Sequence, residues 1–337
     1  MELSAETAFK CKGVDCVKLT AGRYFAIVAP AIGSCVLRLF DTENNIEVFR
    51  WSEKATLKEI NKARVLWGLP TLYLPNRFDG GTLKTSDATY HLPINEPKLN
   101  NFIHGWVHDR EHKLELAEVQ GDKAVCVTSY TFDKTDKMYE YFPLDFKLTY
   151  KYELSEEEGL KQTVILDNLS DKRLPVSVCT HTCLSAPITP GGKQKGMRLR
   201  IAVGERCELN ERCLPTEQLL PLTSRDKRYP NGSMHPVLHT INNEMYTAET
   251  TDLDGKPFYG AVVTDKITGK RVCNEVSKEY RFWNVWNCRG TAGFFCPEPM
   301  TAMINSANLK LKGDVSGYQE LKKGESYQCW QRFFTIG

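Results

Sequence analysis

The sequence predicts an all-β protein, a large antiparallel sandwich with few short helices. Three observations support this fold class. Apolar and polar residues alternate with a period of two in many short segments, turn-forming residues separate these segments, and helical periodicity is scarce. No strand–helix–strand rhythm indicates a parallel sheet. Because no low-complexity linker or internal repeat divides the chain, we predict a single domain over residues 1–337.

The clearest strand reads FKLTYKYEL, residues 146–154, with aromatic and leucine side chains on one face and Lys, Thr and Glu on the other. Turn-rich stretches such as QGDK, DKTDK and SEEEG separate it from similar runs. These runs predict strands at Lys113–Val119, Ala124–Phe132, Lys161–Leu166 and Leu174–Thr180.

Two further elements follow from local signals. Residues 258–276 predict a hairpin that turns at Lys266–Gly269. The best helical candidate is Ser52–Arg64, with Ser52 as its N-cap.

Composition excludes several classes of function. Lys and Arg number 44 against 42 Asp and Glu, so the net charge is +2, and no basic stripe indicates nucleic-acid binding. The N-terminus lacks a signal-peptide pattern, and no apolar run is long enough to predict a membrane span. The 12 cysteines include no Cys-x-x-Cys pair, so we expect reduced, mostly buried thiols in a cytoplasmic protein.

Four segments combine reactive side chains with unusual backbone: PNRFDGG with Arg77, NNFIHGW with His104, VCTHTCLS with His181, and GFFCPEPMT with Glu298. The prolines that flank Glu298 remove two backbone donors, so we expect a stiff, extended segment outside a regular ladder. Taken singly, these residues also suit structural roles: a hydrogen-bonded histidine, a surface ion pair for Arg77, a turn cap for Glu298.

Other chemistries have little support. His104, His108 and His112 share a four-residue spacing, but Gly105 and the strand pattern weaken the helix that would align them on a metal. The chain also lacks a Gly-x-Ser-x-Gly elbow, a phosphate-binding loop and a dinucleotide-binding glycine motif. We therefore expect neither a metal nor an organic cofactor.

The order of these segments resembles the aldose 1-epimerase (galactose mutarotase) family over about three quarters of the chain. The resemblance rests on PNRF, FIHG, DNLSDKRLPVSVCTH, FFCPEPMT, NSANL and LKKGESY. It implies a β-supersandwich and an isomerase that interconverts the α and β anomers of a free hexose such as galactose or glucose. By motif position, it implies that His181 is the general acid and Glu298 the general base. Residues implied to bind the sugar are Asn76, Arg77, His104, Asn243 and Trp286.

The sequence departs from the family pattern in three places. The nearest match to the family's usual aspartate is Asn243, with Tyr246 as the following aromatic, and Thr182, Cys183 and Leu184 replace an aromatic pair after His181. In FWNVWNCRG, Val285, Trp286 and Asn287 replace a more usual Val-Tyr-Thr, and Trp283 or Trp286 could stack on the sugar or pack in the core.

These departures leave two alternatives open: a non-catalytic carbohydrate-binding protein, and a sugar-phosphate mutarotase that adds Lys195, Arg198 and Arg200 to the cations. The expected partner is a small sugar, with no nucleic acid or membrane, and the protein is expected to be a monomer or homodimer.

Overall fold

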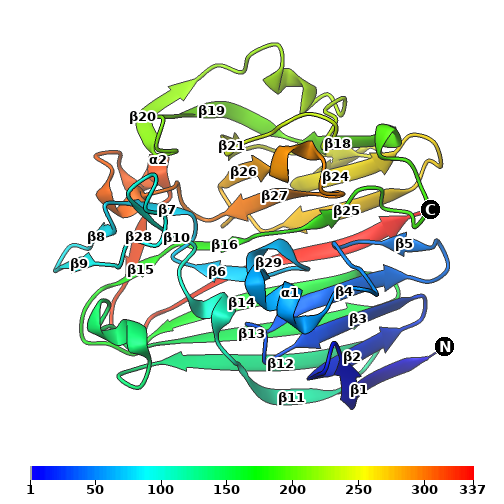
Figure 1. Ribbon diagram of the computed structural model, residues 1–337, viewed down its shortest axis with the longest axis horizontal. Helices are drawn as coiled ribbons and strands as arrows, with labels where there is room; N and C mark the ends of the chain where they lie inside the picture. The colour runs from blue at the N-terminus through cyan, green and yellow to red at the C-terminus, as the bar shows by residue number, and fades with distance from the viewer. Residues whose placement is uncertain (1) are drawn as a thin grey trace.

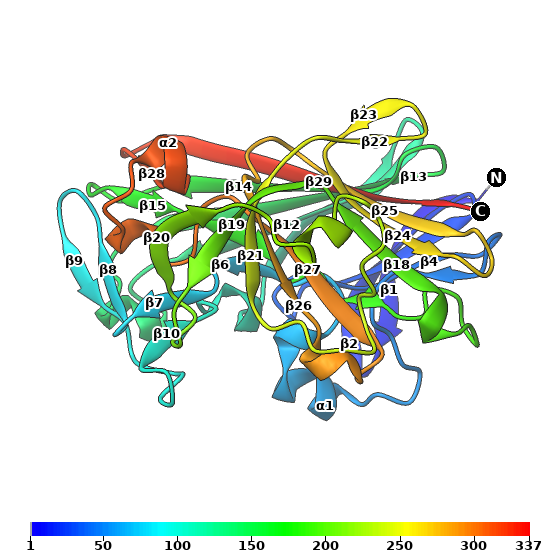
Figure 2. The same ribbon diagram turned by 90° about the horizontal axis from the view of Figure 1, so that it is seen from above.

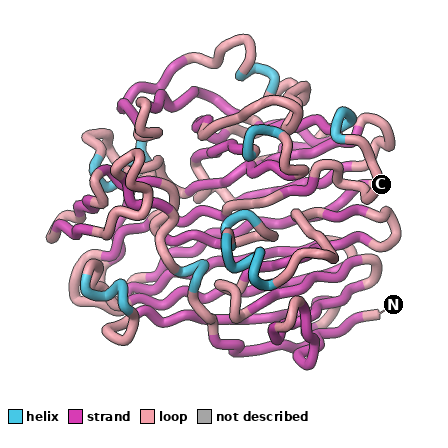
Figure 3. The backbone as a smooth tube through the Cα atoms, in the orientation of Figure 1, coloured by secondary structure: helices cyan, strands magenta, loops and turns pink. Residues whose placement is uncertain are grey.

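A computed structural model describes residues 2–337 and confirms the all-β prediction. Figure 1 shows long strands running across the whole molecule, and Figure 3 shows helices as short segments between strands. None of the helices in residues 2–337 is long and apolar enough to cross a membrane.

One layer is an eight-stranded antiparallel sheet that contains the C-terminal strand. Its order is β11 (Lys113–Gln120), β12 (Lys123–Phe132), β13 (Phe146–Ser155), β14 (Gly159–Asn168), β29 (Ser326–Ile336), β25 (Arg271–Val276), β24 (Gly260–Asp265) and β18 (Met197–Ile201). Along β13 buried and half-buried residues alternate, as the sequence pattern predicts.

The second layer combines two sheets. One holds β20 (Pro215–Leu220), β19 (Val203–Leu209), β21 (Glu244–Ala248), β26 (Phe282–Trp286), β27 (Phe294–Met300), β16 (Val178–Thr180) and β6 (Thr71–Tyr73), with β17 (Leu184–Ser185) also paired to β27. The other holds β1 (Leu3–Cys11), β2 (Val14–Ala21), β3 (Tyr24–Ala29), β4 (Cys35–Asp41) and β5 (Ile46–Glu47). Bridges between Val36 and Leu69 and between Phe49 and Leu184 join the two sheets.

Seen from above, β14 and β29 lie in one layer and β26 and β27 in the other (Figure 2). Apolar side chains from both layers form one large core between them. The result is a sandwich in which one eight-stranded sheet faces two sheets joined side by side.

Short ribbons and helices complete the chain. The two-stranded ribbons pair β7 (Arg77–Asp79) with β10 (Asn101–Ile103), β8 (Thr82–Lys84) with β9 (Thr89–His91), β15 (Leu174–Val176) with β28 (Gln319–Leu321), and β22 (Thr251–Leu253) with β23 (Lys256–Phe258). The helices are α1 (Leu57–Lys62) and α2 (Gly313–Ser316), with 3-10 turns η1 (Arg64–Leu66), η2 (Val107–Asp109), η3 (Lys137–Glu140), η4 (Gln194–Gly196), η5 (Asp226–Arg228), η6 (Cys288–Gly290) and η7 (Ser306–Asn308).

The predicted helix Ser52–Arg64 is too long and starts too early. The α-helix covers Leu57–Lys62, because Thr56 is the N-cap and forms a reciprocal capping box with Glu59. The hairpin prediction is correct: β24 and β25 pair, and the Gly269 N–H donates to the Asp265 carbonyl across the turn.

The predicted strand Leu174–Thr180 is two strands. Residues before Ser177 pair with β28 and those after it pair with β6. The alternation of apolar and polar residues indicates which side chains are buried, but not which strand lies alongside. It therefore does not reveal the change of pairing partner at Ser177.

The expectation that the Glu298 segment lies outside a regular ladder is also wrong. It forms β27, which pairs with β26 along its length from Cys296 to Met300. On its other flank, β27 pairs with β17 at Phe294 and Phe295 and with β16 at Met300, and no strand pairing is assigned between these positions. We infer that the missing donors of Pro297 and Pro299 are tolerated because they face this sparsely paired flank.

Candidate functional site

A cavity of about 150 Å³ on the second layer gathers the residues that the sequence singled out. All seven predicted site residues line it, together with Val65, Leu66 and Ile103, which the sequence analysis did not identify. The seven are Asn76, Arg77, His104, His181, Asn243, Trp286 and Glu298. They come from segments up to 222 positions apart (298 − 76) that the strand pairing brings together.

The closest pair of opposite chemistry in the cavity is His181 and Glu298. His181 follows β16, where its N–H donates to the Pro70 carbonyl at 2.9 Å, and Glu298 lies in the middle of β27. The Nε2 atom of His181 is 3.5 Å from Oε1 of Glu298, and both side chains are buried. This places a proton donor and a proton acceptor side by side at the base of the cavity.

The surroundings of His181 and Glu298 shift the pKa values of both side chains. Burial alone would lower the pKa of His181, but the Glu298 carboxylate and Cys183 outweigh it and raise that pKa to about 9. Burial raises the pKa of Glu298, and the charge of His181 offsets this in part. At neutral pH the imidazole is therefore cationic, and the buried carboxylate binds a proton more strongly than an exposed glutamate does.

Arg77 is fixed by an ion pair at the edge of the cavity. Its Nε and Nη2 atoms donate to the two oxygens of Glu96, each at 2.8 Å, in a bidentate pair. Nη1 donates to Oδ1 of Asn76 at 3.3 Å, and Asn101 donates to Glu96 at 3.1 Å. Glu96 had no distinguishing signal in the sequence, because its loop shows neither alternation nor a motif.

Three lining residues have left-handed backbone conformations: Asn76 at φ 55°, His104 at φ 70° and Asn243 at φ 49°. The His104 N–H donates to the Asn76 carbonyl at 2.9 Å, which ties two of them together. Strained backbone of this kind is concentrated at functional sites in proteins generally.

His104 differs from His181 in charge. Burial and the neighbouring cationic His181 hold the pKa of His104 well below its usual value. Its ring packs edge-on against that of His181, with centroids 5.4 Å apart, and its Nδ1 has no hydrogen-bond partner in the described chain. A neutral imidazole of this kind can donate or accept a hydrogen bond from a ligand.

Of the three aromatic residues considered for sugar binding, one lies at the cavity and two lie in the interior. Trp286 lines the cavity, with its ring centroid 6.1 Å from that of His181, whereas Trp283 is buried in the core. Tyr246 also points away from the site, because its hydroxyl donates to Asp226 at 2.9 Å in the interior.

His108 and His112 do not join His104. His108 lies in the turn η2, and the His112 ring stacks on Tyr150 with centroids 4.9 Å apart. The helix that the four-residue spacing would require is absent from this segment of the structure.

One group in the described chain brings three metal-ligand atoms within 4.8 Å of one another: His181, Cys183 and Cys296. Arg50 lies nearby, with its guanidinium 4.2 Å from the centroid of the Phe294 ring, which packs in one cluster with the two cysteines. A fixed positive charge opposes a metal cation, so this group is better suited to a thiolate than to a metal.

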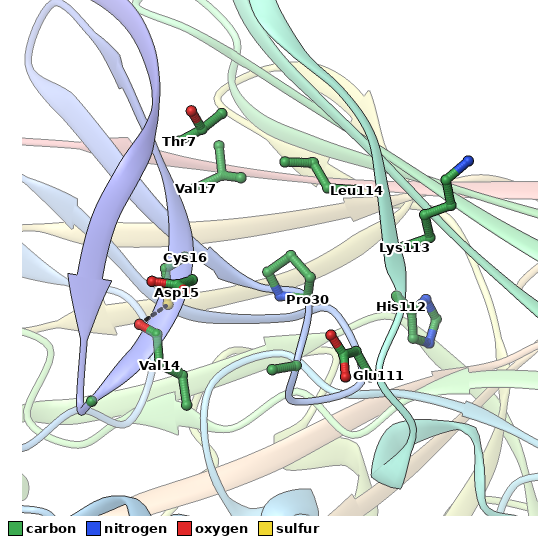
Figure 4. Close-up of a pocket in the computed structure, with 12 residues that line it drawn as sticks. Thr7, Val14, Asp15, Cys16, Val17, Pro30, Glu111, His112, Lys113 and Leu114 are labelled. Carbon is green, nitrogen blue, oxygen red and sulfur yellow. Dashed lines mark hydrogen bonds between the residues drawn. The ribbon is translucent and has the colours of Figure 1, made fainter.

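A larger cavity of about 550 Å³ lies elsewhere, between the β1–β2 hairpin and the start of β11 (Figure 4). Val14, Val17, Pro30 and Leu114 supply much of its apolar wall. It contains none of the predicted site residues and no paired acid and base comparable to His181 and Glu298.

Comparison with known proteins places these features in context. The family model for aldose 1-epimerase matches residues 15–333. A galactose mutarotase-like protein from Clostridium acetobutylicum is 32% identical, with a TM-score of 0.96 over 100% of this chain and 99% of that one. More distant structures share the fold. They include galactose 1-epimerase from Lactobacillus acidophilus (14% identity, TM-score 0.73, 99% of both chains) and a putative aldose 1-epimerase from Escherichia coli (14%, 0.72, 95% and 98%). The match over nearly the whole length shows that this chain belongs to the aldose 1-epimerase family.

Proposed function

We propose that this protein is a mutarotase that interconverts the α and β anomers of a free hexose such as galactose or glucose. The observation that carries the proposal is the buried His181–Glu298 pair, 3.5 Å apart, in a cavity with polar walls. The cavity volume, about 150 Å³, is below the range of about 300–1,000 Å³ typical of drug-sized ligands, which favours a single sugar ring.

Opening a cyclic hemiacetal requires two proton transfers. In our proposal, His181 donates a proton to the ring oxygen while Glu298 removes the proton from the anomeric hydroxyl, and the C1–O5 bond breaks to give the open aldehyde. Rotation about C1–C2 exposes the other carbonyl face. As the ring closes, Glu298 returns its proton to the carbonyl oxygen, and His181 takes its proton back from the O5 hydroxyl. Acid–base catalysis of this kind contributes on the order of 10²–10⁴-fold for each group.

The remaining lining residues are proposed to bind the sugar. The Arg77 fork is held rigid by Glu96, so it loses little freedom when it donates to hydroxyl groups. His104, Asn76 and Asn243 offer further polar atoms, and Trp286 supplies an aromatic face.

A sugar phosphate fits this cavity less well. Arg77 is the one Lys or Arg among its lining residues, and Glu96 already neutralises it. Arg198 and Arg200 line a different cavity of about 330 Å³ that shares no residue with the site. Lys195 lies in η4, near these two residues in the chain.

A purely carbohydrate-binding role remains the contrasting hypothesis, since Asn243 provides an amide where the family has a carboxylate. Binding alone gives no reason for a cationic histidine beside a buried carboxylate, because burying both charges is costly. This consideration favours catalysis.

The test is polarimetry of freshly dissolved α-galactose and α-glucose, with the spontaneous rate subtracted. We expect wild-type protein to accelerate equilibration, and Glu298→Gln and His181→Asn each to lose at least about a hundredfold in kcat. Glu47→Gln is a matched control, because Glu47 is also a buried carboxyl with a raised pKa, to about 8, and lies outside the cavity. Full activity in Glu298→Gln would refute the assignment of the base.

A further inference from the structure

Two cysteines lie directly behind the proposed general acid. Cys183 and Cys296, hereafter the dithiol pair, are both fully buried, and their Sγ atoms are 3.6 Å apart. The pairing of β17 with β27 sets Leu184 opposite Phe295, so the dithiol pair occupies the next step of the same register. Directly opposed residues of antiparallel strands lie within the Cα separation that a disulfide spans, roughly 4.4–6.8 Å.

The surroundings of the dithiol pair favour a thiolate. Sγ of Cys183 is 3.7 Å from Nδ1 of His181, on the side of the ring opposite Nε2 and Glu298. Arg50 stacks between Trp67 and Phe294, 4.0 and 4.2 Å from their ring centroids, and forms no ion pair with a carboxylate in residues 2–337. Arg50 also donates to the Leu66 carbonyl at 2.9 Å, and its positive charge acts on the sulfur of Cys183.

The acid–base properties of the two sulfurs agree with this geometry. Burial would raise the pKa of Cys183, but hydrogen bonds with Cys296 and His181 and the charges of His181 and Arg50 lower it to about 6. Burial and the neighbouring Cys183 raise the pKa of Cys296 well above its usual value. One partner is therefore a nucleophile and the other a protonated thiol.

We propose that the dithiol pair is a redox site: a small peroxide oxidises it to a Cys183–Cys296 disulfide that switches off His181. The effect on His181 rests on the proposed mutarotase function, whereas formation of the disulfide does not.

The chemistry balances with hydrogen peroxide as the two-electron oxidant. The Cys183 thiolate attacks one peroxide oxygen, the O–O bond breaks, and the products are a sulfenic acid and, after protonation, water. Sγ of Cys296 then attacks the sulfenic sulfur; the S–S bond forms, and the S–O bond breaks. The departing hydroxide takes up the Cys296 proton as a second water.

In this proposal peroxide reaches the buried sulfurs from the sugar cavity. Neither cysteine lines that cavity, but His181 and Trp286 line it and also contact the cluster of Cys183, Phe294 and Cys296. A bound sugar would cover this route, so the site would be protected during turnover and exposed in the empty enzyme.

Oxidation would affect His181 through its second nitrogen. A disulfide needs the sulfurs to approach from 3.6 Å to about 2.05 Å, and neither sulfur then carries a negative charge. Nδ1 of His181 loses its anionic neighbour, so the imidazole holds its proton less strongly and its ring is less well fixed.

The direct test treats native wild-type protein with hydrogen peroxide, blocks free thiols after denaturation and maps peptides by mass spectrometry. We expect a disulfide-linked Cys183–Cys296 peptide that dithiothreitol removes, and slower formation at saturating galactose. Recovery of both cysteines as blocked thiols, under conditions that oxidise the more exposed Cys288, would overturn the proposal. This readout is independent of whether the protein is a mutarotase.

Variants test the link to His181. We expect peroxide to lower the wild-type mutarotation rate at least about tenfold, with recovery in dithiothreitol. Cys288→Ser, a matched control for a neighbouring thiol, should behave as wild type. Cys296→Ser cannot form the disulfide, so its Cys183 should remain a sulfenic acid that dimedone traps. A wild-type disulfide that leaves the rate unchanged would refute the switch but not the redox site.

Discussion

At the residue scale, His181 has two different neighbours on its two ring nitrogens. Glu298 lies 3.5 Å from Nε2 and Cys183 3.7 Å from Nδ1, and both favour the charged imidazolium. The sequence had identified the histidine and the glutamate, because both lie in unusual local backbone. It noted Cys183 as a departure from the family pattern, but nothing in the spacing of residues 183 and 296 indicated that they would meet.

This arrangement predicts a bell-shaped dependence of kcat/KM on pH. His181 must be protonated to act as the acid, so the rate should fall as pH rises through about 9. Glu298 must be ionised to act as the base, so the rate should fall as pH decreases through a pKa that burial raises above its usual 4.5. Polarimetry between pH 5 and 10 on reduced enzyme, corrected for the spontaneous reaction, measures both limbs.

Cys183→Ser supplies the comparison for this profile. Replacing a sulfur that carries negative charge with a neutral hydroxyl removes one cause of the raised pKa of His181. The alkaline limb should therefore move to lower pH while the acidic limb changes less. An alkaline limb that stays in place would show that Cys183 does not influence the acid.

At the element scale, short loops and turns position the sugar-binding side chains. Arg77 begins β7, His104 follows β10, and these two strands pair with each other. Gly105 then passes so close to Tyr73 that a Cβ at φ 62° would lie 1.9 Å from the Tyr73 carbonyl oxygen. The ribbon of β7 and β10 can hold His104 in its left-handed conformation because this glycine permits the close approach.

Gly105→Ala should therefore destabilise the protein and disturb the site. We expect a loss on the order of 1–3 kcal/mol beyond the cost of the positive φ alone, together with a raised KM, because the loop must move away from Tyr73. Urea unfolding and polarimetry measure the two effects. Gly80→Ala is the matched control, because Gly80 has φ 55° but a Cβ at this position would have no neighbouring atom within 4 Å. Equal losses in the two variants would contradict the steric explanation.

The sequence predicts a strand well where buried and exposed residues alternate along it. It predicts less well where the limits of a strand depend on which neighbouring strand it pairs with. Alternation located β11 to β14 within a few residues. In β12 and β13 the pattern reflects one buried face, whereas β11 has no fully buried residue. The split of Leu174–Thr180 depends on which strand lies alongside, and the Glu298 segment enters a ladder by pairing with β26 although its two prolines lack backbone donors. The bidentate Arg77–Glu96 pair depends on loop conformation, for which the sequence carries no periodic signal.

At the scale of the whole molecule, the C-terminal strand belongs to one layer and is hydrogen-bonded to the other. β29 lies between β14 and β25 in the middle of the eight-stranded sheet, so its formation joins segments that are far apart in the chain. Near its end, the Thr335 hydroxyl bonds to Asp41 and, at 2.7 Å, to the Tyr24 hydroxyl of the N-terminal sheet. The two ends of the chain are thereby linked through buried polar groups rather than through apolar contact alone.

This link predicts a change in stability that leaves catalysis unaffected. Thr335→Val keeps the shape of the side chain but removes the hydroxyl from the buried Asp41 carboxylate, which should cost about 1–3 kcal/mol of unfolding free energy. The urea midpoint should fall with an unchanged m-value, because the folded core and the surface exposed on unfolding stay the same. The mutarotation rate should not change, since Thr335 lies outside the cavity. Thr335→Ser retains the hydroxyl and should keep most of the wild-type stability. Destabilisation of Thr335→Ser together with a stable Thr335→Val would show that packing of the methyl group, and not the hydrogen bonds, joins the two layers here.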